Sequence, residues 1–187
     1  MSYQIERYPA RKRLPVGHST EIGRIIFHFA RLEWSLKIIS FNLLGINEKQ
    51  GRISVRNFRV NDFVTMLDDL CKLRGIDPQV DWTKLQKDLR KHESFRDRLA
   101  HGIWMKHEAT NIPVIQDISG AYTSGPNVGS KPKIAPLAVP LTTEQLRIIR
   151  QNIQFLCKQT ELINEKVIGA LKALRKKHVR QSRRRGR

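Results

Sequence analysis

The sequence predicts a mainly α-helical protein, an up-and-down bundle of four to five helices with a small β-hairpin insertion. Apolar residues recur at spacings of three and four in four separate stretches, as they do on one face of a helix. One stretch, about residues 105–140, is too rich in Pro and Gly to be helical. The length of 187 residues corresponds to about one domain.

The first helix is predicted to begin after Thr20 and to end at Gly45. Pro15 and Gly17 favour irregular structure before it, so residues 1–18 are expected to form a basic N-terminal arm. The predicted buried face of this helix consists of Ile22, Ile26, Phe29, Glu33, Leu36, Ser40 and Leu43.

Two more helices are predicted in the first half of the chain, after a partly helical connection over 47–60. One runs from about Asn61 to a C-terminal cap at Gly75, and Asp81 caps the next. Their apolar faces are Phe63, Met66, Leu67, Leu70 and Leu73, and then Trp82, Leu85, Leu89, His92, Arg96, Leu99 and Ile103. Trp34, Trp82 and Trp104 are expected to anchor the core.

The second half of the chain contains the insertion and the longest helix. Within 105–140, residues 111–119 and 133–139 have strand-like composition and are predicted to pair as a hairpin. Thr142 and Gln145 form a capping box that starts a helix reaching about Leu174, roughly 48 Å long. A bundle of this size cannot cover that length, so the helix either breaks or packs its second half on another chain. Residues 19–174 thus form the predicted single bundle domain.

The charge of the chain favours a polyanionic partner, nucleic acid before an acidic membrane surface. Lys and Arg number 35 against 17 Asp and Glu, a net charge of +18. Residues 175–187 lack acidic and almost all apolar residues, so a disordered basic tail is expected there. The candidate nucleic-acid-binding residues are Arg98, Arg175, Lys176, Lys177, Arg180, Arg183, Arg184, Arg185 and Arg187.

Several protein classes do not fit the sequence. No run of about 18 apolar residues predicts a membrane span, and the N-terminus lacks the apolar stretch of a signal peptide. Two cysteines, Cys71 and Cys157, form neither a disulfide framework nor a zinc site. A cytoplasmic protein without membrane partner, metal or cofactor is therefore expected.

Three charged or titratable residues interrupt predicted core faces: Glu33, His92 and Arg96. A buried charge without a partner costs several kcal/mol, so each needs a partner or a water-filled cleft. Glu33 and Arg96 are predicted to pair. Either a structural ion pair or a functional site explains them.

The segment Arg96-Asp97-Arg98-Leu99-Ala100-His101 offers a candidate site for RNA cleavage. Asp97 and His101 are four residues apart on a helix, so Asp97 is expected to hold one imidazole nitrogen and aim the other outward. Arg96 suits phosphate, and His101 suits proton transfer near neutral pH. A two-fold dimer would bring two of each residue to one groove.

These residues resemble the Arg-x4-6-His motif of the HEPN superfamily of small helical domains, and the helix around Phe29 and Glu33 resembles that of its bacterial members. The resemblance covers about residues 19–104 and, more loosely, the last helix. It implies a metal-independent endoribonuclease acting as a homodimer, in a toxin–antitoxin or phage-defence setting with an antitoxin partner. In this reading Arg96 clamps the phosphate, His101 transfers protons, Asp97 orients His101, and Glu33 holds Arg96 or a water. Asp97 departs from the Asn that is frequent in the family.

Two other interpretations stay open. A non-catalytic nucleic-acid-binding or protein-interaction module would use the same basic arms without chemistry. A second match to the motif, Arg13 to His18, lies in a Pro- and Gly-rich segment and is set aside.

Overall fold

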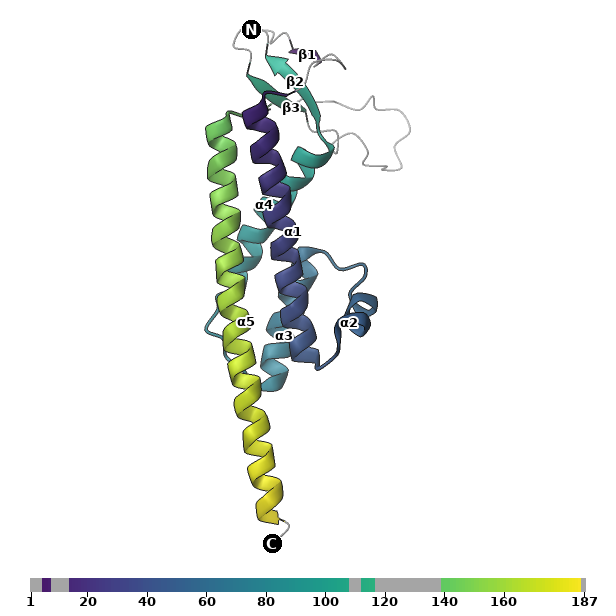
Figure 1. The fold of residues 1–187 in the computed structure, drawn as a ribbon, viewed down its shortest axis with the longest axis vertical. Coiled ribbons are helices and arrows are strands. Elements are labelled where there is room, and N and C mark those ends of the chain that lie inside the picture. Colours follow the sequence, from purple (N-terminus) through teal and green to yellow (C-terminus); the bar gives the residue numbers. More distant parts are fainter. Residues whose placement is uncertain (1–4, 8–13, 108–111, 117–138, 186–187) are drawn as a thin grey trace, which may run out of the picture. The chain divides into compact units, whose positions relative to one another are not determined.

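The computed structural model describes residues 5–7, 14–107, 112–116 and 139–185 (Figure 1). The protein is mainly helical, as the sequence predicts, and its helices form a bundle. The chain divides into two compact units. Residues 1–27 with 94–151 contribute to the first unit, and residues 28–93 with 152–187 contribute to the second. The unit boundaries fall within three continuous helices, so no linker separates the units.

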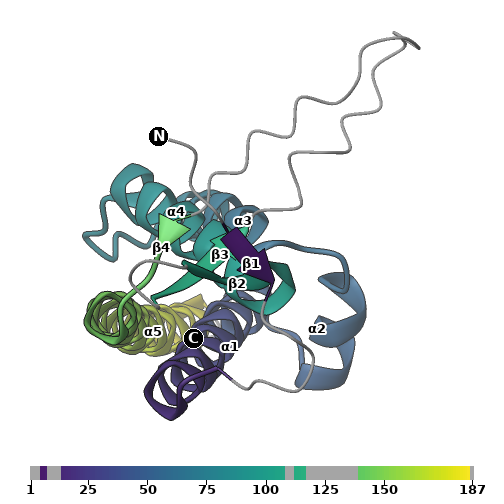
Figure 2. The ribbon, with the colours of Figure 1, turned by 90° about the horizontal axis from the view of Figure 1, so that it is seen from above.

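The first unit contains a small antiparallel sheet with the strand order β1-β2-β3-β4 among the described residues (Figure 2). Its strands are β1 (Ile5–Arg7), β2 (Ile103–His107), β3 (Pro113–Gln116) and β4 (Val139–Pro140). Glu6 pairs with Lys106, Trp104 with Ile115, and Ile115 with Val139.

Helical segments complete the first unit. The first part of α1 (Val16–Leu44), the end of α4 (Trp82–His101) and the start of α5 (Thr143–Arg185) belong to it. Its buried apolar residues are Ile25, Leu99, Ile115, Leu141 and Leu146.

The second unit is all helical among the described residues. It holds α2 (Glu48–Ser54), α3 (Val60–Arg74) and the remaining lengths of α1, α4 and α5. α1 and α5 lie side by side there, joined by a hydrogen bond from Asn42 Nδ2 to Asn164 Oδ1 at 3.2 Å. The largest side chains without solvent exposure include Phe29, Leu32, Leu36, Phe63, Leu67, Leu89 and Ile153.

Local caps set several helix ends where the sequence predicts them. Gly75 ends α3 in the left-handed region, at φ 62°, and its N–H donates to the carbonyls of Cys71 and Lys72. Asp81 Oδ1 accepts from the Lys84 N–H at 2.9 Å at the start of α4. The capping box of Thr142 and Gln145 is confirmed by reciprocal hydrogen bonds of 2.7 and 3.2 Å.

The beginning of the chain differs from the prediction of an irregular arm over residues 1–18. β1 lies within this stretch, and α1 begins at Val16, one turn earlier than predicted. Pro15 directly precedes the helix and accepts the Ser19 N–H at 3.1 Å through its carbonyl, so it marks the helix start without breaking it.

The buried face of α1 also differs from the predicted one. Ile25, Leu32 and Ile39 are fully buried, whereas Ile26 is 39% exposed and Glu33 is only half-buried. The inner face therefore includes Leu32 where the prediction placed Glu33. Trp34, predicted to be a core anchor, is 39% exposed.

The last helix is longer than predicted. α5 continues through Arg185, so the prediction of a helix end near residue 174 and a disordered tail from 175 is wrong (Figure 1). Lys, Arg and Gln favour helix, and neither Pro nor Gly occurs between Gly169 and Gly186. Cationic side chains also suit the C-terminal end of the helix dipole.

The predicted hairpin is shown only at its margins. Residues 113–116 form β3 inside the predicted strand 111–119, and β3 pairs with Val139 and Pro140. Residues 117–138 lie outside the described residues. β3 also pairs with β2, a strand that the helical stripe through Ile103 did not predict.

Candidate functional site

Arg96 and Asp97 lie in the last two turns of α4 and bind each other. Arg96 Nη1 is 2.9 Å from Asp97 Oδ1, and the two side chains are 25% and 52% exposed. Arg96 is therefore reachable from solvent and is not enclosed in the core. Its guanidinium is held by an adjacent carboxylate that an incoming phosphate could displace.

His101 is the final residue of α4 and is exposed. The Gly102 N–H donates to the Arg98 carbonyl at 2.7 Å, and the chain then enters β2 at Ile103. Among the described hydrogen bonds, Asp97 is engaged by Arg96 and not by His101. The expected orientation of His101 by Asp97 is thus replaced by an ion pair, because a guanidinium attracts a carboxylate more strongly than a neutral imidazole does.

One chain places Arg96 and His101 on different sides of α4. Five residues correspond to about 140° around the axis and about 7.5 Å along it. A phosphate held by Arg96 therefore does not lie over His101 on the same helix face. Two such pairs, from two chains, would supply a phosphate clamp and a proton donor or acceptor to one substrate.

Glu33 lies on α1 in the second unit, whereas Arg96, Asp97 and His101 belong to the first. The pairing of Glu33 with Arg96 stays a prediction. His92, in contrast, is buried as the sequence predicts. Burial, followed by the charge of Lys91, lowers the pKa of His92 below its usual value, so this imidazole is neutral at neutral pH.

Sequence reasoning missed a buried polar cluster in the first unit. Glu21 is 5% exposed, and its carboxylate accepts from Arg150 Nε at 2.7 Å and Arg24 Nη1 at 3.1 Å. Burial alone would raise the pKa of Glu21, but the hydrogen bond and charge of Arg150, with Arg24, lower it. The sequence signal was present: residues 18, 21 and 25 continue the buried spacing of α1 toward its start.

His18, the histidine of the second motif match, belongs to the same region and is buried. Its Nε2 lies 2.8 Å from the Leu141 carbonyl oxygen, which only accepts, so Nε2 donates. Its Nδ1 lies 3.0 Å from the Thr143 hydroxyl, which donates to the neutral imidazole. Both ring nitrogens tie α1 to the start of α5, and neither is available for proton transfer to a substrate.

The basic residues predicted to bind nucleic acid are on helices. Arg98 on α4 and four residues on α5 are exposed: Arg175, Lys176, Lys177 and Arg180. Arg183, Arg184 and Arg185 continue the α5 backbone, and Arg187 lies outside the described residues. We call the α5 segment from Arg175 to Arg185 the basic extension. Its backbone is helical, so its charges are spaced by about 1.5 Å per residue.

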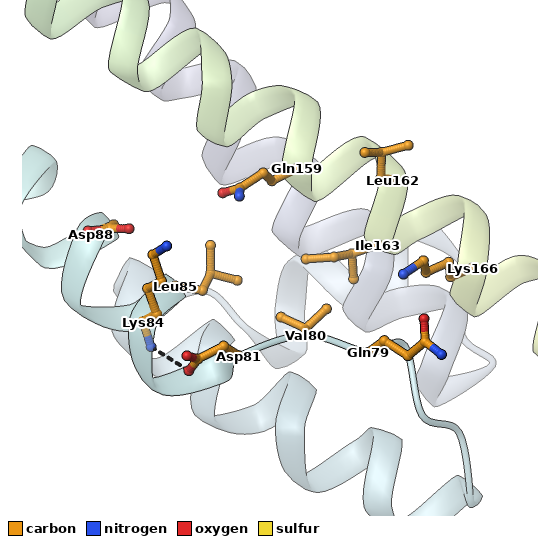
Figure 3. Close-up of a pocket in the computed structure, with 10 residues that line it drawn as sticks. All are labelled: Gln79, Val80, Asp81, Lys84, Leu85, Asp88, Gln159, Leu162, Ile163 and Lys166. Carbon is orange, nitrogen blue, oxygen red and sulfur yellow. Dashed lines mark hydrogen bonds between the residues drawn. The ribbon is translucent and has the colours of Figure 1, made fainter.

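A hollow of about 290 Å³ lies in the second unit (Figure 3). Leu85 and Ile163 form part of its apolar lining, and Lys166 Nζ donates to the Pro78 carbonyl at 2.9 Å. Its charged residues balance: Asp81 and Asp88 offset Lys84 and Lys166, leaving no surplus charge for a phosphate. It includes none of the candidate site residues. The complete lining is Gln79, Val80, Asp81, Lys84, Leu85, Asp88, Gln159, Leu162, Ile163 and Lys166.

The cysteines are buried in the part of the chain that the structure describes and do not form a disulfide there. Burial raises the pKa of both Cys71 and Cys157 to about 11, so both thiols are protonated at neutral pH. Among residues 5–7, 14–107, 112–116 and 139–185, no group of three or more His, Cys, Asp or Glu side chains is placed to hold a metal ion.

Comparisons with known proteins give no match: no protein-family model, no curated protein and no solved structure resembles the chain significantly. None of the described helices has an apolar run of the length and hydropathy that a bilayer crossing requires.

Proposed function

We propose that the protein is a HEPN-type, metal-independent endoribonuclease of the cytoplasm that acts on RNA as a homodimer. The observation that carries the proposal is the end of α4, where Arg96 and His101 both reach solvent and the helix stops at His101. The motif residues stand on opposite parts of a helix end, which suits a site completed by a second copy. A toxin–antitoxin or phage-defence setting, with an antitoxin as partner, belongs to the same proposal.

The proposed chemistry is transesterification within the RNA. His101 of one copy removes the 2′-OH proton, and the 2′ oxygen attacks the adjacent phosphorus. Arg96 leaves Asp97 for the phosphate and stabilises the extra negative charge on its oxygens. The P–O5′ bond breaks, and the 5′ oxygen takes a proton from the second His101. The products are a 2′,3′-cyclic phosphate and a 5′-OH, and no metal or cofactor takes part.

Exposed basic residues supply affinity in this proposal. Arg98 and the basic extension would contact the phosphate backbone without reading sequence. The same surface favours the second candidate function, a non-catalytic nucleic-acid-binding module, because binding needs only the exposed charges. The two candidates differ in what they require of His101.

The test compares RNA cleavage and RNA binding by the full chain in excess EDTA. His101→Ala should lower the cleavage rate on the order of 10²–10⁴-fold and leave binding nearly unchanged. Arg96→Ala should reduce both cleavage and phosphate binding. Arg98→Ala, the control two residues along the same helix, should weaken binding only slightly and retain cleavage.

Two results would contradict the proposal. If the wild type binds RNA without EDTA-resistant cleavage of any RNA tested, the protein is a binding module. If both variants cleave like the wild type, the activity does not reside at the end of α4. An adjacent gene for a nucleotidyltransferase or a small antitoxin would support the defence setting.

A further inference from the structure

The side of α1 that faces away from its buried residues carries a second regular stripe. Val16, Phe27 and Trp34 are 83%, 64% and 39% exposed, and the residues between them at helical spacing are exposed as well. Phe27 lies about 200° around the helix from the buried Ile25. We call this set the outer stripe; its spacings are four, three, four, three and four, and it consists of Val16, Thr20, Gly23, Phe27, Ala30 and Trp34.

The spacing of the outer stripe is that of a helix–helix seam. Alternating steps of three and four residues keep a face toward one neighbouring helix over several turns. The six residues lie along one continuous helix, so helical spacing alone places them on one face. Large apolar side chains exposed at seam spacing indicate a face that another helix covers.

The outer stripe carries no charge, although 28% of the residues in the chain are charged and the net charge is +18. The nearest arginines are engaged elsewhere: Arg24 binds Glu21 at 3.1 Å, and Arg31 binds Glu161 at 2.5 Å. Two molecules of this charge repel each other over most of their surfaces. An uncharged face with its flanking arginines paired is where two copies can meet.

The outer stripe also complements itself in size. In an antiparallel pair related by a two-fold axis near residue 25, Gly23 faces the partner's Phe27 and Phe27 faces the partner's Gly23. An added Cβ at Gly23 would meet no atom within 4 Å, so the space beside it is open to a large side chain. The same axis places Thr20 opposite Ala30 and Val16 opposite Trp34, small against small and large against large.

The protein already packs one helix on the continuation of this face. Phe41 is the next seam position after Trp34, and it is 3% exposed because α2 covers it. Gly51 is the buried residue of α2, and an added Cβ there would overlap the Phe41 ring. The Arg52 guanidinium lies 5.3 Å from the Trp34 ring centroid. A glycine against a phenylalanine thus seats a helix on this face within the chain, as Gly23 and Phe27 would between chains.

We infer that two copies of the chain associate through the outer stripe of α1, antiparallel, with Gly23 of each copy receiving Phe27 of the other. This interface rests on the dimer of the proposed function and specifies the surface that forms it. It does not depend on cleavage by His101.

The test measures the mass in solution by sedimentation over a range of concentrations at moderate salt. The wild type should be a dimer of the 21.7 kDa chain. Phe27→Glu should raise the dissociation constant on the order of 100-fold or more, because it places a charge in a closed apolar contact. Phe155→Glu is the matched control: Phe155 is a 60% exposed phenylalanine on α5, and its replacement should leave the dimer intact.

A size exchange tests the register independently of charge. Gly23→Phe alone should dissociate the dimer because two phenylalanines would occupy one space. The double variant Gly23→Phe with Phe27→Gly should restore it, because each large residue again faces a glycine. Circular dichroism of each variant verifies that α1 still folds.

The outcomes separate the interface from the proposed function. If the wild type is a dimer that Phe27→Glu and Gly23→Phe do not weaken, the outer stripe is not the interface, although a dimeric nuclease survives. If the wild type is monomeric at every concentration, the interface is refuted, and a site composed of two copies fails with it. If the variants are monomeric yet cleave RNA like the wild type, the interface stands and the composite site is wrong.

Discussion

At the scale of single residues, the polar groups of the first unit divide into those that hold the fold and those that reach solvent. Glu21 and His18 are buried, and every polar atom of their side chains is bonded to a neighbouring element. Arg96 and His101 are the accessible counterparts at the end of α4. A role in proton transfer therefore falls to His101, and a role in stability falls to Glu21.

Glu21→Gln should lower the free energy of unfolding by about 2–3 kcal/mol at pH 7, because it leaves the largely buried Arg150 without its counter-charge. Urea unfolding measures this. Glu161→Gln breaks an exposed pair with Arg31 and should cost less than about 1 kcal/mol. Equal losses in the two variants would show that burial does not strengthen the Glu21 pair.

The same residue predicts a pH dependence. The pKa of Glu21 is lower in the folded protein than in the unfolded chain, so its carboxylate contributes stability above about pH 4.5. That contribution should disappear as the pH falls through the folded-state pKa. The Glu21→Gln variant should lose less stability than the wild type over this range.

At the scale of elements, α2 is a short helix held by few contacts. Gly51 against Phe41 and Arg52 over Trp34 attach it to α1, while Ile53 on α2 is 79% exposed. The capping box of Asn47 and Gln50 stabilises it locally. Its attachment therefore depends on the absence of a side chain at residue 51.

Gly51→Ala should displace α2 and cost about 1–3 kcal/mol of unfolding free energy, because the new methyl group overlaps the Phe41 ring. Hydrogen exchange of the amides in 48–54 should accelerate. Gly169→Ala provides the control: it lies in α5 with open space around it and should stabilise the protein by up to about 1 kcal/mol. Unchanged exchange in α2 would contradict the contact.

The end of α5 is the second element whose role can be isolated. Val167 is the last buried residue of α5, so deletion of residues 175–187 should leave the folded core intact. The deletion removes eight Lys and Arg residues. Each lost contact with single-stranded RNA should flatten the slope of log K against log salt by about 0.7. Fluorescence anisotropy with labelled RNA at several salt concentrations measures it, and an unchanged slope would show that the basic extension does not touch RNA.

At the scale of the whole molecule, the net charge of +18 opposes folding through self-repulsion. Raising the salt from about 0.01 M to about 0.15 M shortens the Debye length from about 30 Å to about 8 Å. The Tm should therefore rise by a few degrees, which corresponds to about 1 kcal/mol for a chain of this size. Calorimetry measures the Tm, and the variant without residues 175–187 should show a smaller rise. A Tm that falls or stays constant would show that attractive ion pairs outweigh the repulsion.

Features that depend on neighbours within a few residues could be predicted from the sequence. The αL cap at Gly75, the Asp81 cap and the Thr142–Gln145 box involve partners at most four residues apart. The buried faces of α4 and α5 could be predicted because polar residues occupy their other sides, and Leu85, Leu89, Ile153 and Val167 are buried as expected. In the candidate site, the helical placement of Arg96 and His101 follows from the same local pattern.

The tertiary structure decided the features that depend on distant partners. α1 is apolar on more than one side, so spacing alone could not choose between a face with Ile26 and Glu33 and the buried face with Ile25 and Leu32. That choice depends on partners more than a hundred residues away. The Leu141 carbonyl, for example, binds His18 across 123 positions. Likewise, Asp97 turned to Arg96 and away from His101 because the geometry at the end of α4 brought the guanidinium within 2.9 Å. The sequence by itself determined where the helices and their caps lie, because those depend on short-range hydrogen bonds and spacing. Only tertiary packing determined which faces are buried and which ion pairs form.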